Sequence, residues 1–171
     1  MFNLNSIKKI INIETSESDN KKSATFQKLV LSNNKIEHIH SNAFHQIDKC
    51  TQIYLNNNNI KFIHSGAFNV ITHDDINNNN PLQIFLSKNN LNSDSFETEF
   101  VHHSKNSNRK IYFDISKNKI DILHENIWKN LLENEQISID LTDNPLKLSS
   151  TNMTWLMNSS KLMVRIEGLK S

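Results

Sequence analysis

Apolar residues recur along this chain in a short fixed pattern that fits neither one helix nor one ordinary amphipathic strand. Counted from residue 26, apolar side chains stand at positions four, six and eleven, and an asparagine stands at position nine. The pattern starts again at residue 50, which gives a first period of 24 residues, and further copies start at residues 81, 110 and 136. A self-similar period of this length predicts a solenoid of five stacked turns.

Positions four and six predict a short strand whose apolar side chains point inward, because residues two apart on a strand face the same side. One turn alone cannot cover this apolar face, so the next turn must stack on it. We therefore expect one parallel sheet with nearly identical register, and loops or short helices on the opposite, convex side. The expected inward residues are Leu29, Leu31, Ile53, Leu55, Ile84, Leu86, Phe113, Ile115, Ile139 and Leu141.

The asparagine at position nine is the strongest signal in the sequence. It stands where the chain bends inward after the strand, and its amide can both donate to and accept from backbone groups buried there. We expect these residues to form a single structural file, and Asn58→Ala to lower the melting temperature more than Asn57→Ala, whose side chain should face solvent. The members of this asparagine ladder are Asn34, Asn58, Asn89, Asn118 and Asn144.

The repeats divide the chain into three parts. Residues 1–25 hold a partial N-terminal repeat or an edge strand, with Ile11–Ile13 as the candidate strand. Residues 26–146 hold the five repeats, and insertions near Thr72–Asn80 and Val101–Arg109 lengthen two of the steps. Residues 147–171 form a cap without cysteine. The cap is expected to be sealed by packing of Leu148, Met153, Trp155, Leu156, Leu162 and Val164.

From Thr25 to about Leu162 the chain resembles the extracellular-type leucine-rich repeats, and the pairs Ala43-Phe44 and Ala67-Phe68 are typical of that type. The resemblance implies an α/β solenoid, a horseshoe with its parallel sheet on the concave face. More narrowly, the chain resembles arthropod proteins similar to the non-catalytic subunit of oplophorus-luciferin 2-monooxygenase. The narrower resemblance is carried by Leu91–Glu97, Glu125–Trp128, Asp143–Leu146 and Met153–Leu156.

The composition bears on which partners the chain is expected to bind and in which compartment it is expected to occur. Lysine and arginine number 19 against 18 acidic residues, so charge gives no reason to expect nucleic acid or an anionic membrane as partner. No apolar run reaches the roughly 20 residues of a spanning helix, and we read no signal peptide. Cys50 is the only cysteine, which excludes an intrachain disulfide. The family resemblance implies an extracellular location, whereas the missing leader and cap cysteines leave a cytoplasmic one open.

The sequence contains no motif of an active site or a cofactor site. It has no glycine-rich phosphate loop, nucleophile elbow or metal-spaced His/Glu pair, so we expect no enzyme activity, no cofactor and no metal. His40, His64 and His124 follow position fourteen in three repeats, where we expect turn residues, and His102-His103 reads as a solvated loop. Two glycosylation sequons begin at Asn152 and Asn158, which matter only if the chain is secreted.

The expected function is recognition of a protein partner on the concave face of the sheet. Exposed aromatic rings have no role in the core and are favoured at protein interfaces. We therefore expect Tyr54, Phe85 and Tyr112 to anchor a partner, and Asp114 and Asp140 to select its charge. Scattered exposed hydrophobic residues are the alternative interpretation. Two other functions stay open, a non-catalytic scaffold subunit of an enzyme complex and a fragment of a longer receptor-like repeat protein.

Overall fold

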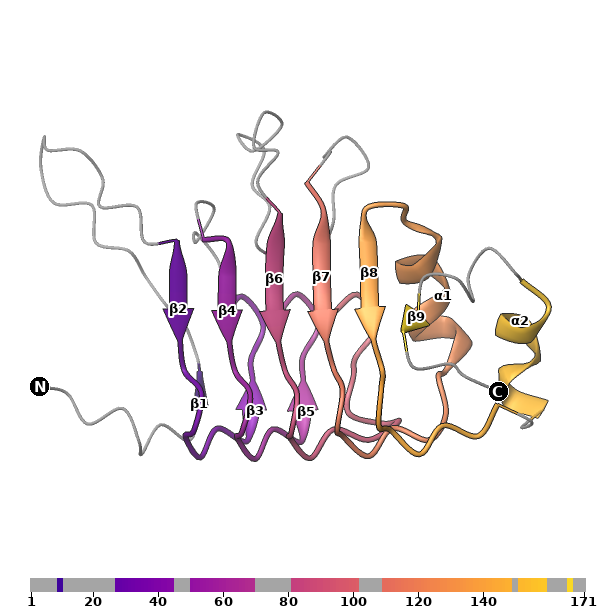
Figure 1. Ribbon diagram of the computed structural model, residues 1–171, viewed down its shortest axis with the longest axis horizontal. Helices are drawn as coiled ribbons and strands as arrows, with labels where there is room; N and C mark the ends of the chain where they lie inside the picture. The colour runs from indigo at the N-terminus through magenta and orange to yellow at the C-terminus, as the bar shows by residue number, and fades with distance from the viewer. Residues whose placement is uncertain are drawn as a thin grey trace, which may run out of the picture.

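The computed structural model describes residues 9–10, 27–44, 50–69, 81–101, 109–148, 151–159 and 166–167. Its strands form two parallel sheets on opposite sides of a coiled chain (Figure 1). The larger sheet contains, in this order, β2 (Lys28–Val30), β4 (Gln52–Tyr54), β6 (Leu82–Phe85), β7 (Ile111–Asp114), β8 (Ile137–Asp140) and β9 (Ile166–Glu167). The smaller sheet contains β1 (Lys9–Ile10), β3 (His38–Ile39) and β5 (Phe62–Ile63).

The strands of the larger sheet stack without any shift in register. Position four of each turn pairs with position four of the next, in the file Leu29, Ile53, Ile84, Phe113 and Ile139. These five side chains point inward, and all but the partly buried Leu29 at the end of the file are fully buried. The predicted solenoid with a parallel sheet is therefore confirmed.

The inner face of the later strands is longer than the sequence pattern indicated. In β6, β7 and β8, the residue two places before position four is also buried. The sequence analysis missed these three core residues, although they continue the alternation of the strand by one step. They are Leu82, Ile111 and Ile137.

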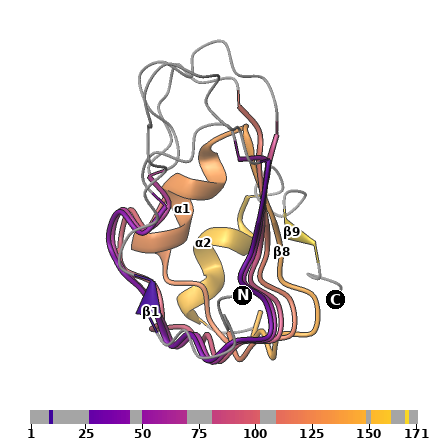
Figure 2. The same cartoon turned by 90° about the vertical axis from the view of Figure 1, so that its left-hand side faces the viewer.

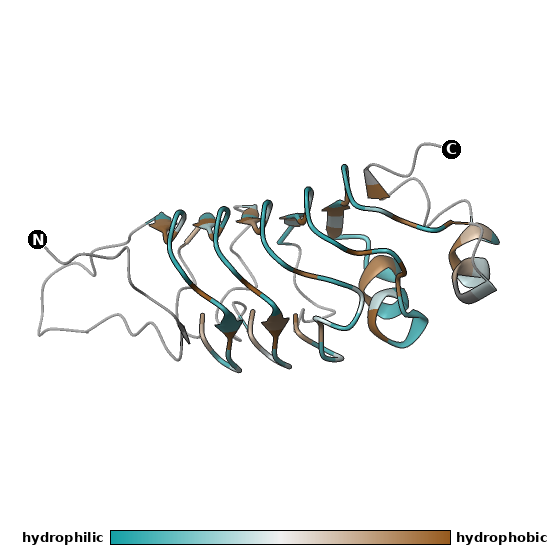
Figure 3. Cartoon of the chain, turned by 90° about the horizontal axis from the view of Figure 1, so that it is seen from below, coloured by the Kyte–Doolittle hydropathy of each residue, from teal (hydrophilic) through white to brown (hydrophobic). Residues whose placement is uncertain are grey.

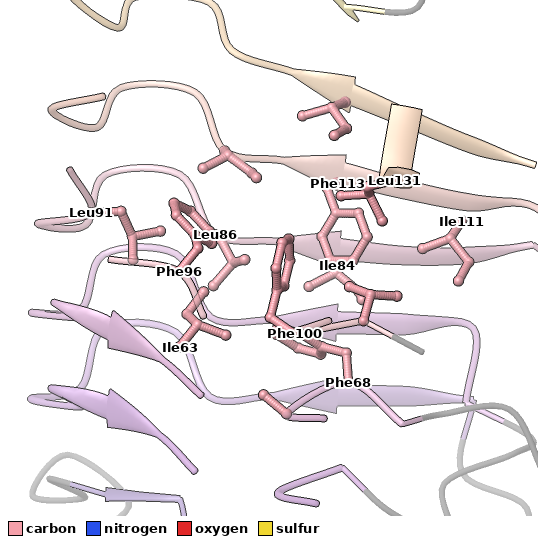
Figure 4. Packing of buried hydrophobic residues seen from close by; sticks show 14 of the residues in the cluster. Ile63, Phe68, Ile84, Leu86, Leu91, Phe96, Phe100, Ile111, Phe113 and Leu131 are labelled. Atoms are coloured by element: carbon pink, nitrogen blue, oxygen red, sulfur yellow. The ribbon is translucent and has the colours of Figure 1, made fainter. Parts of the chain in front are cut away.

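The core lies between the larger sheet and the convex side of the turns. The rings of Phe44 and Phe68 stack with centroids 5.2 Å apart, and Trp128 meets Phe96 edge-on at 4.8 Å. Phe100 contacts Phe113 of β7, so aromatic rings join the convex turns to the sheet (Figure 4). Seen from below, hydrophobic and hydrophilic segments alternate along each turn (Figure 3).

The third turn is lengthened at a place that the sequence analysis did not identify. Ile63 of β5 bridges to Phe96, whereas the uniform spacing of the repeat would have placed Asp94 there. Part of the extra length of this turn therefore lies between Leu91 and Phe96. The predicted insertion Val101–Arg109 accounts for the rest, and both of its end residues are buried.

Side-chain links also join neighbouring turns on the convex side of the bend. The Asp121 carboxylate accepts a hydrogen bond from Ser93 Oγ at 2.6 Å and pairs with Lys147 Nζ at 2.7 Å. The Lys147 and Ser93 hydrogen bonds lower the pKa of Asp121 to about 2, against an ordinary value of 3.8. One carboxylate thus bridges three successive turns while it remains charged.

Helices close the C-terminal end of the stack. Helix α1 (Glu125–Glu133) buries Trp128, Leu131 and Leu132, and it lies on the side of the turns away from the larger sheet (Figure 2). The 3₁₀ helix η3 (Thr151–Met153) and helix α2 (Thr154–Met157) follow. No helix in the described part of the chain is long and apolar enough to cross a lipid bilayer.

The cap is held by packing and by hydrogen bonds to the last repeat. Met153 and Leu156 are fully buried, and Trp155 Nε1 donates to the Leu123 carbonyl at 3.2 Å. Leu148 is partly buried against the core, whereas Leu162 and Val164 lie outside the described residues. Ile166, which the sequence analysis did not select, is buried where β9 pairs with β8.

Candidate functional site

The asparagines at position nine join successive turns through their side-chain amides. Asn58 Nδ2 donates to the carbonyl of Leu55 in its own turn at 2.9 Å and to that of Leu31 in the preceding turn at 3.0 Å. Its Oδ1 accepts a hydrogen bond from the amide of Ile36 at 3.1 Å. Each amide group of this kind satisfies three backbone groups buried at the bend.

The same arrangement continues toward the C-terminus. Asn89 and Asn118 are buried, while Asn144 is partly buried, and each donates to its own turn and to the preceding one. Asn34 donates to Leu31 at 2.9 Å, but its buried Oδ1 accepts no hydrogen bond from the described part of the chain. The ladder is therefore a structural element of the bend and offers no surface to a partner.

The residue before each ladder asparagine adopts a left-handed backbone conformation. The φ angles at these five positions lie between 55° and 59° in the residues Asn33, Asn57, Lys88, Lys117 and Asp143. Asparagine and aspartate tolerate this region better than other non-glycine residues. The two lysines are therefore the strained members of the file.

A second left-handed file lies on the convex side, at Asn42, Gly66 and Glu99. The Asn42 amide donates to the Gly66 carbonyl at 3.0 Å, and the Gly66 amide donates to Glu99 at 2.9 Å. Only two glycines occur in the chain, and one of them takes this position. Seven of the eight left-handed residues described in these two files are therefore not glycine, and three of them are asparagine.

The solvent-facing side of the larger sheet is the candidate binding surface, which we call the strand face. Its residues occupy positions three and five of each turn, and parallel pairing places those of successive turns side by side. The strand face consists of Lys28, Val30, Gln52, Tyr54, Gln83, Phe85, Tyr112, Asp114, Ser138 and Asp140.

Two aromatic rings at the middle of the strand face stack on each other. Tyr54 and Phe85 have centroids 4.6 Å apart and ring planes within 18° of parallel. Lys28 Nζ lies 4.5 Å from the centroid of the Tyr54 ring. The two rings and Tyr112, which the sequence predicted to be exposed, are partly buried. In the stacked pair, each ring covers one side of the other. The most exposed hydrophobic residue on this face is Val30, at 52%.

Two carboxylates continue the file of position five beyond the rings. Asp114 is the register partner of Phe85, and Asp140 is the register partner of Asp114. Each carboxylate accepts hydrogen bonds from the amide and hydroxyl of the residue two places later, Ser116 or Thr142. The structure therefore brings four of the residues that the sequence singled out into one line across the sheet, and Tyr112 lies beside this line on β7.

The N-terminal repeats of the chain match a known protein family. Residues 25–73 match the sequence profile of the family described as Leucine rich repeat. Together with the parallel sheet, this match gives the chain the fold of a leucine-rich-repeat solenoid. No curated protein matches it significantly, so the narrower resemblance to luciferase-subunit-like proteins and the extracellular type gains no support. Leucine-rich repeats generally mediate protein–protein interactions and are generally not enzymes.

His40 and His64 follow the strands β3 and β5 of the smaller sheet, and His124 precedes helix α1. The rings of His40 and His64 stack at 4.8 Å and within 10° of parallel. His64 Nδ1 lies 3.4 Å from Glu97, and His124 Nε2 lies 3.2 Å from Asp94. Within the described ranges, no group of three His, Cys, Asp or Glu side chains is arranged to hold a metal ion. His102-His103 lies outside those ranges.

A shallow depression lies where α1 begins, beside the cap. Its lining consists of His124, Glu125, Asn126, Thr151, Thr154 and Trp155. The Thr154 hydroxyl donates to the Thr151 carbonyl, while the His124 imidazole contacts Asp94. The hydroxyl and the imidazole are therefore not coupled as a nucleophile and base would be.

Cys50, the sole cysteine of the sequence, and the fully buried Arg109 have structural positions. Arg109 Nη2 donates to the Cys50 carbonyl and so connects the end of the third turn to the start of the second. Burial raises the pKa of the Cys50 thiol, which makes it a poor nucleophile. Arg109 was missed by the sequence analysis because it lies at the end of an insertion.

The two sequons lie in the cap. Asn158 is exposed where α2 ends, and Asn152 lies in η3. Thr154, which completes the first sequon, is also exposed. Their glycosylation stays a prediction.

Proposed function

We propose that the chain is a non-enzymatic binding module that recognises a protein partner on the strand face. The observation that carries the proposal is the single line formed by Tyr54, Phe85, Asp114 and Asp140 across four successive turns. It combines a flat apolar platform with a charged end, and Tyr112 borders it on β7.

The energetics of the surface support this proposal. A stacked aromatic pair presents a large rigid area, and ordering it on binding costs little side-chain entropy because stacking already restrains both rings. The neighbouring carboxylates are held by Ser116 and Thr142, so they too are positioned before a partner arrives. Preorganised anchors surrounded by polar groups are the usual composition of binding hot spots.

A capture experiment tests the proposal. The immobilised chain and its Tyr54→Ser/Phe85→Ser variant would be exposed to an extract of the source organism, and bound proteins would be compared by quantitative mass spectrometry. We expect at least one protein to bind the native chain saturably and to be lost from the double variant. Thermal unfolding of both proteins would verify that the variant is folded.

A matched control uses the other sheet. Phe62 of β5 is also a partly buried aromatic residue, but it lies away from the strand face. Phe62→Ser should keep the captured protein. Capture that survives in Tyr54→Ser/Phe85→Ser but is lost in Phe62→Ser would contradict the proposal and place the binding surface on the smaller sheet.

A further inference from the structure

Asp114 and Asp140 place two negative charges side by side on the strand face. They are register partners on neighbouring strands, which lie about 4.8 Å apart. Among the described residues, no Lys, Arg or His side chain pairs with either carboxylate. Like charges directly opposite each other destabilise a sheet, so this pair costs free energy in the isolated chain.

The orientation of both carboxylates is fixed by the chain itself. Asp114 Oδ1 accepts hydrogen bonds from Ser116 N at 3.0 Å and from Ser116 Oγ at 2.6 Å. Asp140 Oδ1 accepts from Thr142 N at 2.7 Å and from the Thr142 hydroxyl. Each Oδ2 accepts no hydrogen bond from any described residue and remains available to a donor on a partner.

The aromatic neighbour of this pair defines the kind of cation that fits. Phe85 is the register partner of Asp114, so a group bound to the carboxylates lies beside a ring. At the other end of the aromatic pair, Lys28 already lies 4.5 Å from the centroid of the Tyr54 ring. The Tyr54 ring therefore already makes a cation–π contact with a lysine of the same chain.

We infer that the partner supplies an arginine to Asp114 and Asp140 and an apolar side chain to Tyr54 and Phe85. This inference rests on the proposed function of the strand face. A guanidinium group is planar, donates several hydrogen bonds in a fixed geometry and stacks on aromatic rings. A lysine ammonium group is a compact, strongly hydrated charge and matches two carboxylates and a ring less well.

The spacing of the two subsites specifies the backbone of the partner. The centre of the aromatic pair and the centre of the acidic pair lie two strands apart, about 9.6 Å. In a polyproline II segment, residues three apart lie on one side and about 9.3 Å apart. In a β-strand, residues three apart point to opposite faces. A polyproline II segment in which an apolar residue and an arginine are three positions apart matches this spacing, and we take it as the occupant.

Synthetic peptides test this occupant directly. The probe is the acetylated, amidated peptide Pro-Pro-Leu-Pro-Pro-Arg-Pro-Pro, compared with versions that carry lysine or neutral citrulline in place of arginine. Binding to the full chain would be followed by the backbone amide resonances of Ser116 and Thr142, which donate to the two carboxylates. We expect the arginine peptide to shift both resonances and to bind on the order of tenfold more tightly than either comparison peptide.

Protein variants separate this contact from a general effect of charge. Asp114→Asn and Asp140→Asn should each remove the preference for arginine while the leucine still shifts the resonances of Tyr54 and Phe85. Asp143→Asn makes the same charge change at an exposed residue of the bend and should leave the preference unchanged.

The outcomes distinguish this inference from the proposed function. Equal affinity for the three peptides, or no binding of the arginine peptide at millimolar concentration, would overturn the inference alone. The proposed function would still stand if Tyr54→Ser/Phe85→Ser abolished capture of a partner. Loss of the arginine preference in Asp143→Asn as well would also overturn the inference.

Discussion

At the residue scale, asparagine performs two different tasks in this solenoid. At position nine its side chain replaces the hydrogen bonds that the bend removes from the backbone. One position earlier its backbone takes up the left-handed conformation that the bend requires. The two tasks fall on adjacent residues, so substitutions at neighbouring asparagines have different physical consequences.

Asn58→Ala and Asn57→Ala test this difference. Loss of the Asn58 amide leaves two carbonyls and one backbone amide unsatisfied in the interior, which should lower the free energy of unfolding by about 3 kcal/mol. Asn57 is exposed, and alanine there should cost only about 1 kcal/mol through its unfavourable left-handed backbone. Urea unfolding measures both values.

Asn57→Gly is the control for the backbone contribution, because glycine adopts positive φ without strain. It should cost less than Asn57→Ala although it also removes the whole side chain. Equal losses of stability in Asn58→Ala and Asn57→Ala would show that the assigned register is incorrect.

Lys88 allows the opposite test, in which stability is gained. The backbone φ of Lys88 is 55°, and the equivalent residue in each of the first two turns is an asparagine with positive φ. Lys88→Asn should therefore raise the free energy of unfolding by about 0.5 kcal/mol. Lys110 is also an exposed lysine but has no positive φ, and Lys110→Asn should give no gain. The same change in melting temperature for both variants would mean that backbone strain at residue 88 is negligible.

At the element scale, the sheet could be predicted from the sequence because each strand repeats the same short pattern. Leu82, Ile84 and Leu86 alternate with residues of the strand face. This alternation of three apolar residues indicates the longer inner face of the later strands. The lengthened third turn could not be predicted in this way. Extra residues between Leu91 and Phe96 disturb neither of these apolar residues. The sequence therefore does not indicate where in the third turn the extra residues lie.

The first strand of the smaller sheet also has a signal in the sequence. The spacing of Asn5, Ile7 and Ile10 repeats that of Asn34, Ile36 and Ile39. Ile10 of β1 pairs with Ile39 of β3, as this spacing requires. The candidate Ile11–Ile13 lies outside the described residues. In contrast, β9 has no counterpart in the repeats, and its pairing with β8 depends on how the cap folds back.

The cap provides the prediction at this scale. Leu156 is fully buried beneath α2, while its neighbour Met157 is 49% exposed. Leu156→Ala should lower the free energy of unfolding by about 3 kcal/mol, because it removes buried methyl groups and leaves a cavity at the end of the stack. Met157→Ala should change stability by less than about 0.5 kcal/mol. Similar losses in thermal unfolding of both variants would contradict the assignment of α2 as a seal.

At the scale of the whole molecule, stacking converts a one-dimensional repeat into a surface. Residues 24 or more positions apart in the sequence become neighbours on the strand face. The sequence pattern therefore predicted which residues share this face. It could not predict that Tyr54 and Phe85 cover each other or that Lys28 lies against a ring, since these contacts depend on side-chain rotamers across strands.

The arrangement of the acidic end of the strand face could also be predicted only in part from the sequence. Asp114 and Asp140 are each followed two places later by a hydroxyl residue, Ser116 or Thr142. This pattern is a local signal for carboxylates held by the next polar residue. The closeness of the two carboxylates to each other, however, follows only from the register of β7 and β8.

Site-specific photo-crosslinking measures most directly whether the strand face is the binding surface. A benzoyl-phenylalanine would replace Phe85 in one protein and Phe62 in another, so that the reactive groups lie on the larger and the smaller sheet. The captured partner should be crosslinked from position 85 and not from position 62. Crosslinking from position 62 without crosslinking from position 85 would contradict this prediction.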